Sequence, residues 1–240
     1  MRRGAAILGL SGPSLTAWER PFLADYQPFG VILFARNIET PEQIRTLTAD
    51  VRGLLGPDVL VFVDQEGGRV QRLRGPYWRE WNPPLQTVTA AGPHAARAMA
   101  LRSTLISNEL RALGINANCA PVADIAGAAT HPFLQNRCYG QDAQTVTDIA
   151  RAIADAHLTA GVLPVLKHIP GHGRSGADTH HDLPRVTAPI AELDATDFAP
   201  FRALNDLPMA MTAHVLYTAI DPVNMATVSP KIISLIRSEL

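Results

Sequence analysis

The chain of 240 residues is 47% hydrophobic and carries a formal net charge of -1 at pH 7. That length suits a single domain over residues 1–240 with one sizeable core, and the composition is that of an ordinary soluble globular protein. The balanced charge argues against a nucleic-acid partner, and every apolar stretch is shorter than the roughly 18 residues that cross a membrane.

Six short apolar runs predict buried β-strands, because the strands of a parallel sheet are hydrophobic on both faces. They cover residues 5–10, 30–35, 59–63, 115–120, 162–166 and 209–213. Helical segments separate these runs. Repeated βα units with short connections indicate a parallel sheet, which is either a barrel or an open, doubly wound layer.

The predicted helices carry recognisable ends. Thr40 supplies an N-cap and Pro41 a first-turn proline for a helix that stops before Gly56. The predicted helices over residues 95–113 and 143–160 stop at Gly114 and Gly161, where glycine accommodates the left-handed conformation that commonly follows a helix.

Polar residues follow or lie just beyond five of the six predicted strands. They are Arg36 and Asn37, then Asp64, Gln65 and Glu66, then Asp124, then Lys167 and His168, and finally His214. The carboxyl ends of the strands meet at one face in a TIM-type barrel, whereas an open sheet concentrates its site at one switch point. The pattern therefore favours the barrel.

Asp64 precedes a Gly-Gly pair, and Arg72 follows in the same segment. A carboxylate at this position can accept hydrogen bonds from two neighbouring sugar hydroxyls, with Arg72 returning to the site as a donor. The alternative is that Asp64 only caps the loop and that the glycines only permit a tight turn. For Arg137 the default is a surface position, and Asp124 is interpreted as a structural cap.

The histidine-rich segment 165–182 admits three interpretations. In the first, Asp178 orients His180 and raises its pKa toward the working pH, which suits general acid/base chemistry. In the second, this pair binds a metal such as zinc together with His168 and His172, since imidazole and carboxylate are common zinc ligands. In the third, the residues form a hydrogen-bonded loop without chemistry.

Together these motifs resemble those of the bacterial β-N-acetylhexosaminidases of glycoside hydrolase family 3, the NagZ type of cell-wall recycling. The matching segments are residues 30–37, 63–72, 121–124, 136–140, 167–173, 178–180 and 211–215. They run in order across nearly the whole chain. The departures are mild: Ile169 stands where the family usually has Phe, and Thr179 where it usually has Ser.

The resemblance implies a TIM-type (β/α)8 barrel, of which this chain supplies about six βα units, and removal of terminal β-linked N-acetylglucosamine with retention of configuration. By match to the family's motifs, the sugar-binding residues are Asp64, Arg72, Arg137, Lys167 and His168. His180 would be the general acid/base, oriented by Asp178. No cofactor and no metal is implied, which disfavours the zinc interpretation.

The same resemblance predicts a cytoplasmic enzyme of peptidoglycan recycling that acts on cell-wall-derived glycans or muropeptides, as a monomer when full length. Its nucleophilic aspartate is expected beyond Leu240, after the helix that Ser229 and Pro230 open. The 240-residue chain is therefore expected to be inactive by itself. The alternative function is that of a non-catalytic sugar-binding or regulatory remnant of the same fold.

Cys119 and Cys138 have no metal-ligand spacing and are interpreted as reduced thiols of a cytoplasmic protein. The first ten residues have a basic start and a short apolar run. That run is too short for a secretory signal, so we expect a first β-strand instead.

Overall fold

A parallel sheet in sequential strand order forms the frame of the molecule. The computed structural model describes residues 3–128, 130–175 and 183–240. The main sheet has the order β1-β2-β3-β6-β7, and β8, which follows β7 after one residue, pairs with β10. These strands are β1 (Gly4–Gly9), β2 (Pro28–Leu33), β3 (Leu60–Val63), β6 (Ala117–Asn118), β7 (Leu163–Pro164), β8 (Leu166–Ile169) and β10 (Ala210–Thr212).

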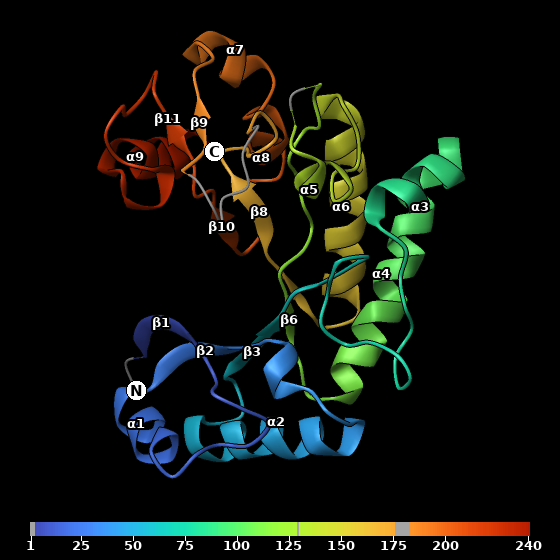
Figure 1. The fold of residues 1–240 in the computed structure, drawn as a ribbon, viewed down its shortest axis with the longest axis vertical. Helices are drawn as coiled ribbons and strands as arrows, with labels where there is room; N and C mark the ends of the chain where they lie inside the picture. Colours follow the sequence, from blue (N-terminus) through green and yellow to red (C-terminus); the bar gives the residue numbers. More distant parts are fainter. Residues whose placement is uncertain (1–2, 129, 176–182) are drawn as a thin grey trace.

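Every pairing in this series is parallel, and the strands of the series lie in the same order as in the chain. A doubly wound sheet would reverse its order at a switch point, and this one does not. Figure 1 shows the resulting arc, with β1, β2 and β3 in its lower part, β6 at the centre, and β8 and β10 above. This is the strand order of a TIM-type barrel.

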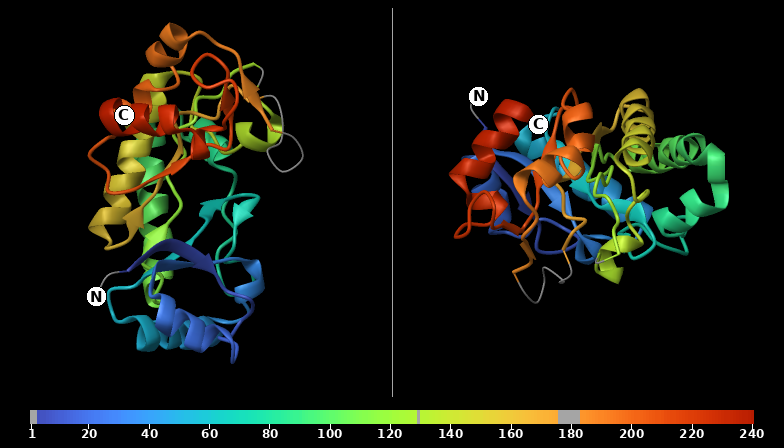
Figure 2. Two further views of the ribbon diagram at one scale, coloured as in Figure 1. Left: turned by 90° about the vertical axis from the view of Figure 1, so that its left-hand side faces the viewer. Right: turned by 90° about the horizontal axis from the view of Figure 1, so that it is seen from above.

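The helices lie on the outside of the arc. They are α1 (Glu19–Tyr26), α2 (Pro41–Leu55), α3 (Pro84–Ala91), α4 (Ala95–Ala112), α5 (Pro132–Gln135), α6 (Ala143–Thr159), α7 (Ile190–Ala195), α8 (Ala199–Ala203) and α9 (Pro230–Glu239). Figures 1 and 2 show α2 along β1, β2 and β3, and α4 side by side with α6. Within the described ranges, every helix is too short or too polar to cross a membrane.

Two further pairs of short strands complete the sheet structure of the described part. The antiparallel hairpin of β4 (Gln65–Gly67) and β5 (Val70–Gln71) follows β3 directly. The parallel pair of β9 (Arg185–Val186) and β11 (Leu216–Tyr217) lies beside the upper strands in Figure 1. Of the two, only the hairpin supplies residues to the site described below.

The helix ends that the sequence predicts are confirmed. The Thr40 hydroxyl accepts the backbone N–H of Gln43 at the start of α2, and the Ser229 hydroxyl accepts that of Ile232 at the start of α9. Gly114 and Gly161, after α4 and α6, adopt φ of +77° and +75°, which a residue with a side chain adopts only with strain.

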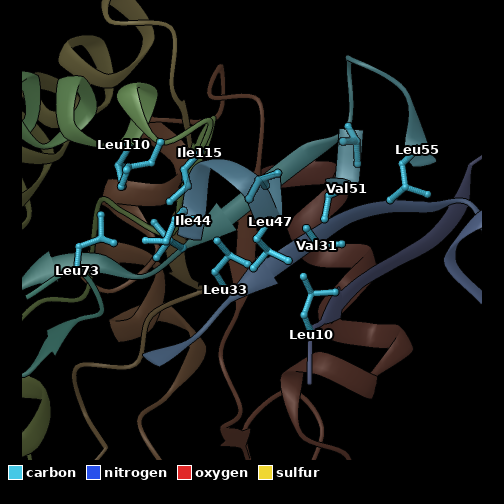
Figure 3. Close-up of a cluster of buried hydrophobic side chains, with 14 of the residues drawn as sticks. Leu10, Val31, Leu33, Ile44, Leu47, Val51, Leu55, Leu73, Leu110 and Ile115 are labelled. Carbon is cyan, nitrogen blue, oxygen red and sulfur yellow. The ribbon is translucent and has the colours of Figure 1, made fainter. Parts of the chain in front are cut away.

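Behind the first three strands lies the largest hydrophobic cluster, drawn in Figure 3. One face of α2 contributes Ile44, Leu47, Val51 and Leu55, and the strand side contributes Leu10, Val31 and Leu33. Each such side chain stabilises the fold by about 1.5–3 kcal/mol when it is fully buried. The cluster thereby fixes β1, β2 and β3, and with them the residues that follow β3.

One predicted strand end is wrong in a way that matters for the site. Lys167 and His168 were expected to follow a strand over residues 162–166, but they lie within β8. Pro164 has no N–H for the ladder, so the strand breaks after it. Beyond it, Lys167 still donates its N–H to the Pro121 carbonyl on the β6 side, and Leu166 donates its N–H to the Met209 carbonyl on the β10 side.

Candidate active site

Asp64 lies at the carboxyl end of β3 and is held by two cations. Its Oδ1 accepts Lys167 Nζ at 3.0 Å, and its Oδ2 accepts Arg72 Nη2 at 3.1 Å. The β4–β5 hairpin brings Arg72 back toward Asp64. The Gln65 side chain closes this hairpin by accepting the backbone N–H groups of Arg72 and Leu73. Arg72, which was expected from the sequence to return to the site as a donor, thus lies beside Asp64.

Glu66, two residues later, is buried and also paired with cations. Its Oε1 lies 2.5 Å from Lys167 Nζ and 2.8 Å from Arg137 Nη2, and its Oε2 accepts Arg137 Nε at 2.9 Å. The sequence placed Glu66 after the third strand but indicated no role for it in the site. The available signal was a second acidic residue directly after a buried strand, at a position that a short hairpin turns inward.

Arg137 is not a surface residue, so that default interpretation was wrong. Only 8% of Arg137 is exposed. It follows the short helix α5, and its guanidinium makes two parallel hydrogen bonds to the Glu66 carboxylate. A buried guanidinium needs such a partner, and the planar fork of arginine matches a carboxylate. Arg137 Nη2 also lies 3.4 Å from His168 Nε2.

Asp124 is a fully buried cap, as the sequence predicts, and it also fixes a ring of the site. Its Oδ1 accepts the backbone N–H groups of His168 and His172, at 3.2 and 2.7 Å. Its Oδ2 lies 2.7 Å from His168 Nδ1. An ionised carboxylate only accepts hydrogen bonds, so this contact assigns the proton to Nδ1 and leaves His168 Nε2 as an acceptor.

Burial and ion pairing act in opposite directions on these charges. Burial alone would raise the pKa of Asp64, but Lys167 and Arg72 outweigh it and hold that pKa at about 2. Burial would lower the pKa of Lys167, but Glu66 and Asp64 raise it above its ordinary value. For Glu66, burial is again outweighed by Lys167 and Arg137, and the pKa is lowered. The cluster is therefore ionised at neutral pH.

The five residues predicted to bind sugar all line one cavity of about 420 Å³. Its described lining consists of Ile32, Phe34, Asp64, Val70, Arg72, His131, Phe133, Leu134, Arg137, Lys167, His168, His172, Met211, Thr212 and His214. It combines carboxylate, ammonium, guanidinium and imidazole groups with apolar side chains from β2 and α5. Such a surface suits a polyhydroxylated ligand that also has apolar parts.

The convergence of five strand ends is less complete than predicted. Arg36 and Asn37, which follow β2, do not line this cavity; the Asn37 side chain donates to the carbonyls of Leu10 and Gly12 and ties two loops together. Ile32 and Phe34 face the cavity in their place. The end of β2 thus supplies an apolar wall.

A larger cavity, of about 890 Å³, lies between the loop around residue 126 and the segment from β9 to α7. Its described lining includes none of the predicted sugar-binding residues, and its central cation Arg174 is already paired with Asp197 and Glu192. We place the candidate site in the smaller cavity, because that is where the buried charges converge. Asp178 and His180, the predicted acid/base pair, lie outside the described residues.

The family follows from comparison with known proteins. The sequence profile described as "Glycosyl hydrolase family 3 N terminal domain" matches residues 9–240. The chain belongs to glycosyl hydrolase family 3. The family that its motifs predict is thereby confirmed.

Two curated family 3 relatives are "Beta-hexosaminidase" proteins of Alkalilimnicola ehrlichii and Methylococcus capsulatus. The chain is 40% identical to the first over 226 residues and 41% identical to the second over 219 residues. These alignments cover 92% and 90% of the chain, but 65% and 64% of the relatives. The chain thus spans slightly less than two thirds of the length of these relatives.

Solved family 3 structures share the fold. NagZ from Neisseria gonorrhoeae, in complex with N-trifluoroacetyl-D-glucosamine, matches with a TM-score of 0.87 at 32% identity over 94% of this chain and 68% of that one. A β-N-acetylglucosaminidase from Paenibacillus matches with a TM-score of 0.86 at 33% identity over 97% of this chain and 45% of that one. These matches confirm the α/β, TIM-type barrel class.

Proposed function

We propose that the protein acts as a retaining β-N-acetylhexosaminidase that removes terminal β-linked N-acetylglucosamine from cell-wall-derived glycans or muropeptides. The observation that carries this proposal is the convergence of Asp64, Arg137 and Lys167 on one cavity, within a single ion-paired network. The relatives named β-hexosaminidase support the same activity. We place the reaction in the cytoplasm and the enzyme in peptidoglycan recycling.

The sugar is held by hydrogen bonds from both kinds of charge. The Asp64 carboxylate accepts from ring hydroxyls, while Lys167 and Arg72 donate to hydroxyl oxygens beside it. Arg137, from the loop after α5, and His168, from β8 beside Lys167, complete the sugar-binding residues. A buried group built to pair with a hydroxyl discriminates strongly against ligands that lack it, because leaving it unpaired costs about 1–3 kcal/mol.

We assign proton transfer to His180 and its orientation to Asp178, on the family's motif rather than on geometry. An imidazole beside a carboxylate can be protonated near neutral pH; as imidazolium it protonates the leaving group, and the neutral ring then takes a proton from the attacking water. No metal takes part in this scheme.

Retention also requires a carboxylate nucleophile about 5–5.5 Å from the acid/base group. Asp64 and Glu66 are poor candidates because both are occupied by cations. We therefore place the nucleophile in the part of the relatives' length that the chain does not span. On this proposal, residues 1–240 bind the sugar but do not turn it over.

The test is hydrolysis of 4-nitrophenyl N-acetyl-β-D-glucosaminide by the protein made from the complete coding sequence, with the first-formed anomer identified by NMR. We expect the β anomer. His180→Ala should lose most activity on substrates with poor leaving groups and less on the activated aryl glycoside, whose departure needs little protonation. Release of the α anomer, or activity that a chelator abolishes and zinc restores, would contradict the proposal.

A further inference from the structure

Glu66 contacts both buried cations, Arg137 and Lys167, of the described cavity lining. The exposed fraction of its side chain is 1%, and its two carboxylate oxygens contact Lys167 once and Arg137 twice. The paired cations come from β8 and from the loop after α5, which are far from Glu66 in sequence. The carboxylate therefore joins three separate parts of the chain.

Its position differs from that of Asp64, although both follow β3. Asp64, Arg137 and Lys167 line the cavity, whereas Glu66 is absent from the described lining. Glu66 thus contacts Lys167 and Arg137 without lining the cavity itself. A group so placed acts on a ligand only through Lys167 and Arg137.

The backbone at Glu66 is fixed independently of its carboxylate. Arg102, buried on α4, donates to the Glu66 carbonyl oxygen and to the hydroxyl of Thr87. A Cβ added at Gly67, where φ is +107°, would lie 1.7 Å from Arg102 Nη2. The Gly-Gly pair therefore makes room for this arginine. Because Arg102 holds the turn, changing the Glu66 carboxylate to an amide alters the charge and leaves the turn supported.

The charge balance shows what Glu66 contributes. Arg72, Arg137 and Lys167 bring three positive charges to the cluster, and of the carboxylates that form ion pairs with them in the described residues, only Asp64 would remain without Glu66. Lys167 would then be held by Asp64 alone, the group that is needed to accept hydrogen bonds from a ligand. Arg137 would lose both of its parallel hydrogen bonds.

We propose that Glu66 is a positioning residue of the sugar site: it holds the Lys167 ammonium and the Arg137 guanidinium in the directions from which they bind substrate. This rests on the proposed function. Interactions that hold binding groups in place before the substrate arrives affect the ground-state complex, so their loss raises KM more than it lowers kcat.

The experiment compares Glu66→Gln with Glu19→Gln in the protein made from the complete coding sequence. Glu19 is a matched control, because it is equally buried and accepts two backbone N–H groups, but it lies on α1, away from the site. With the aryl substrate, we expect Glu66→Gln to raise KM at least about tenfold and to change kcat less than about threefold. Glu19→Gln should change only the melting temperature.

A double-mutant cycle with Lys167→Met separates positioning from a general structural role. If Glu66 acts through Lys167 and Arg137, Glu66→Gln should raise KM by a clearly smaller factor in the Lys167→Met background than in the wild type. The proposal would be overturned if Glu66→Gln raised KM by the same factor in both backgrounds. A KM of Glu66→Gln within twofold of the wild-type value would also overturn it. Should Glu66→Gln fail to fold, Glu66→Asp takes its place; this change withdraws the carboxylate by one methylene and should also raise KM.

A crystal structure of Glu66→Gln gives a readout that does not depend on activity. We expect Lys167 Nζ to shift toward Asp64, its remaining partner, or Arg137 to turn away from the cavity. Unchanged positions of both groups would overturn the proposal even if the proposed hydrolysis is not observed. Wild-type protein without turnover, but with these displacements in the variant, would instead contradict the proposed function alone.

Discussion

Two buried polar networks meet at β6 and differ in charge. The first is the ion-paired cluster of Asp64, Glu66, Arg137 and Lys167, which reaches the cavity. The second lies behind the sheet, where His157 of α6 contacts the Ser107 hydroxyl of α4 at 2.7 Å and the Asn118 side chain at 3.3 Å. This second network consists of neutral groups.

Asn118 connects the two. Its side chain accepts the backbone N–H of Gln65 and donates to the Gln65 carbonyl, so it fixes the segment between Asp64 and Glu66. Because Asn118 Nδ2 donates to His157 Nε2, the proton of the ring lies on Nδ1 and is donated to Ser107.

The difference between the networks indicates what each is for. Buried charges cost far more to desolvate than neutral groups, and well-packed apolar residues often replace them without loss of stability. Charges are therefore expected where a ligand is contacted, and a neutral network suffices where only the fold is held. The predictions below test this division, from the largest expected effect to the smallest.

Asp64→Ala should lower kcat/KM by about 10²–10³-fold, because it removes charged hydrogen bonds worth about 1.5–3 kcal/mol each. The fold should persist, since Lys167 keeps Glu66 as a partner. Steady-state kinetics with the aryl substrate and a thermal melt check both points. Asp50→Ala, which removes an exposed partner of Arg20, is the control and should be neutral. Unchanged kinetics would remove Asp64 from the site.

His157→Leu should lower the stability of the fold and leave substrate binding almost unchanged. It leaves the Ser107 hydroxyl and one Asn118 N–H unpaired in the core, which should lower the free energy of unfolding by about 3–4 kcal/mol. Urea unfolding measures this loss. KM of the folded variant should stay within about twofold of the wild-type value. A large rise in KM would show that the neutral network also sets the geometry of the site.

Acidification should destabilise the two networks in separate pH windows. Burial lowers the pKa of His157 from 6.5 to about 4, so the unfolded chain takes up the proton first. The free energy of unfolding is therefore not reduced by His157 above pH 6.5. It falls by on the order of 3 kcal/mol as the pH drops toward 4. The pKa of Asp64 is lowered from 3.8 to about 2, so its contribution is complete above pH 3.8 and is lost between pH 3.8 and 2.

Urea unfolding at a series of pH values separates these windows. His157→Leu should flatten the profile between pH 6.5 and 4 while leaving the lower window. Asp64→Ala should flatten the profile between pH 3.8 and 2 while leaving the loss between pH 6.5 and 4. A profile of His157→Leu that falls as steeply as the wild-type profile above pH 4 would assign that loss to other groups.

The parts of the fold that the sequence encodes locally were predicted well. The caps of α2 and α9 depend on Thr40, Ser229 and the residues beside them, so they can be recognised without knowing the fold. The return of Arg72 toward Asp64 could be anticipated because a short hairpin joins them. Placing polar residues at strand ends found Asp64, Lys167, His168 and His214 of the cavity lining.

What the sequence did not predict depends on contacts between distant segments. Arg137 is 71 residues from Glu66, and nothing next to it in the chain indicates that its guanidinium is buried. His157 resembles any polar residue of an amphipathic helix until Ser107 and Asn118 are placed around it. The end of the fifth strand was missed because β8 is extended by its pairing with β10, a strand far along the chain.

The most direct test of the central claim is a crystal structure of the protein made from the complete coding sequence, with N-acetylglucosamine bound. The account predicts the sugar in the cavity of about 420 Å³, with its hydroxyls within hydrogen-bonding distance of the Asp64 carboxylate and Lys167 Nζ. It also predicts that Glu66 contacts no atom of the sugar. A sugar bound in the larger cavity beside Arg174, or one that leaves the Asp64–Lys167 pair uncontacted, would contradict the account.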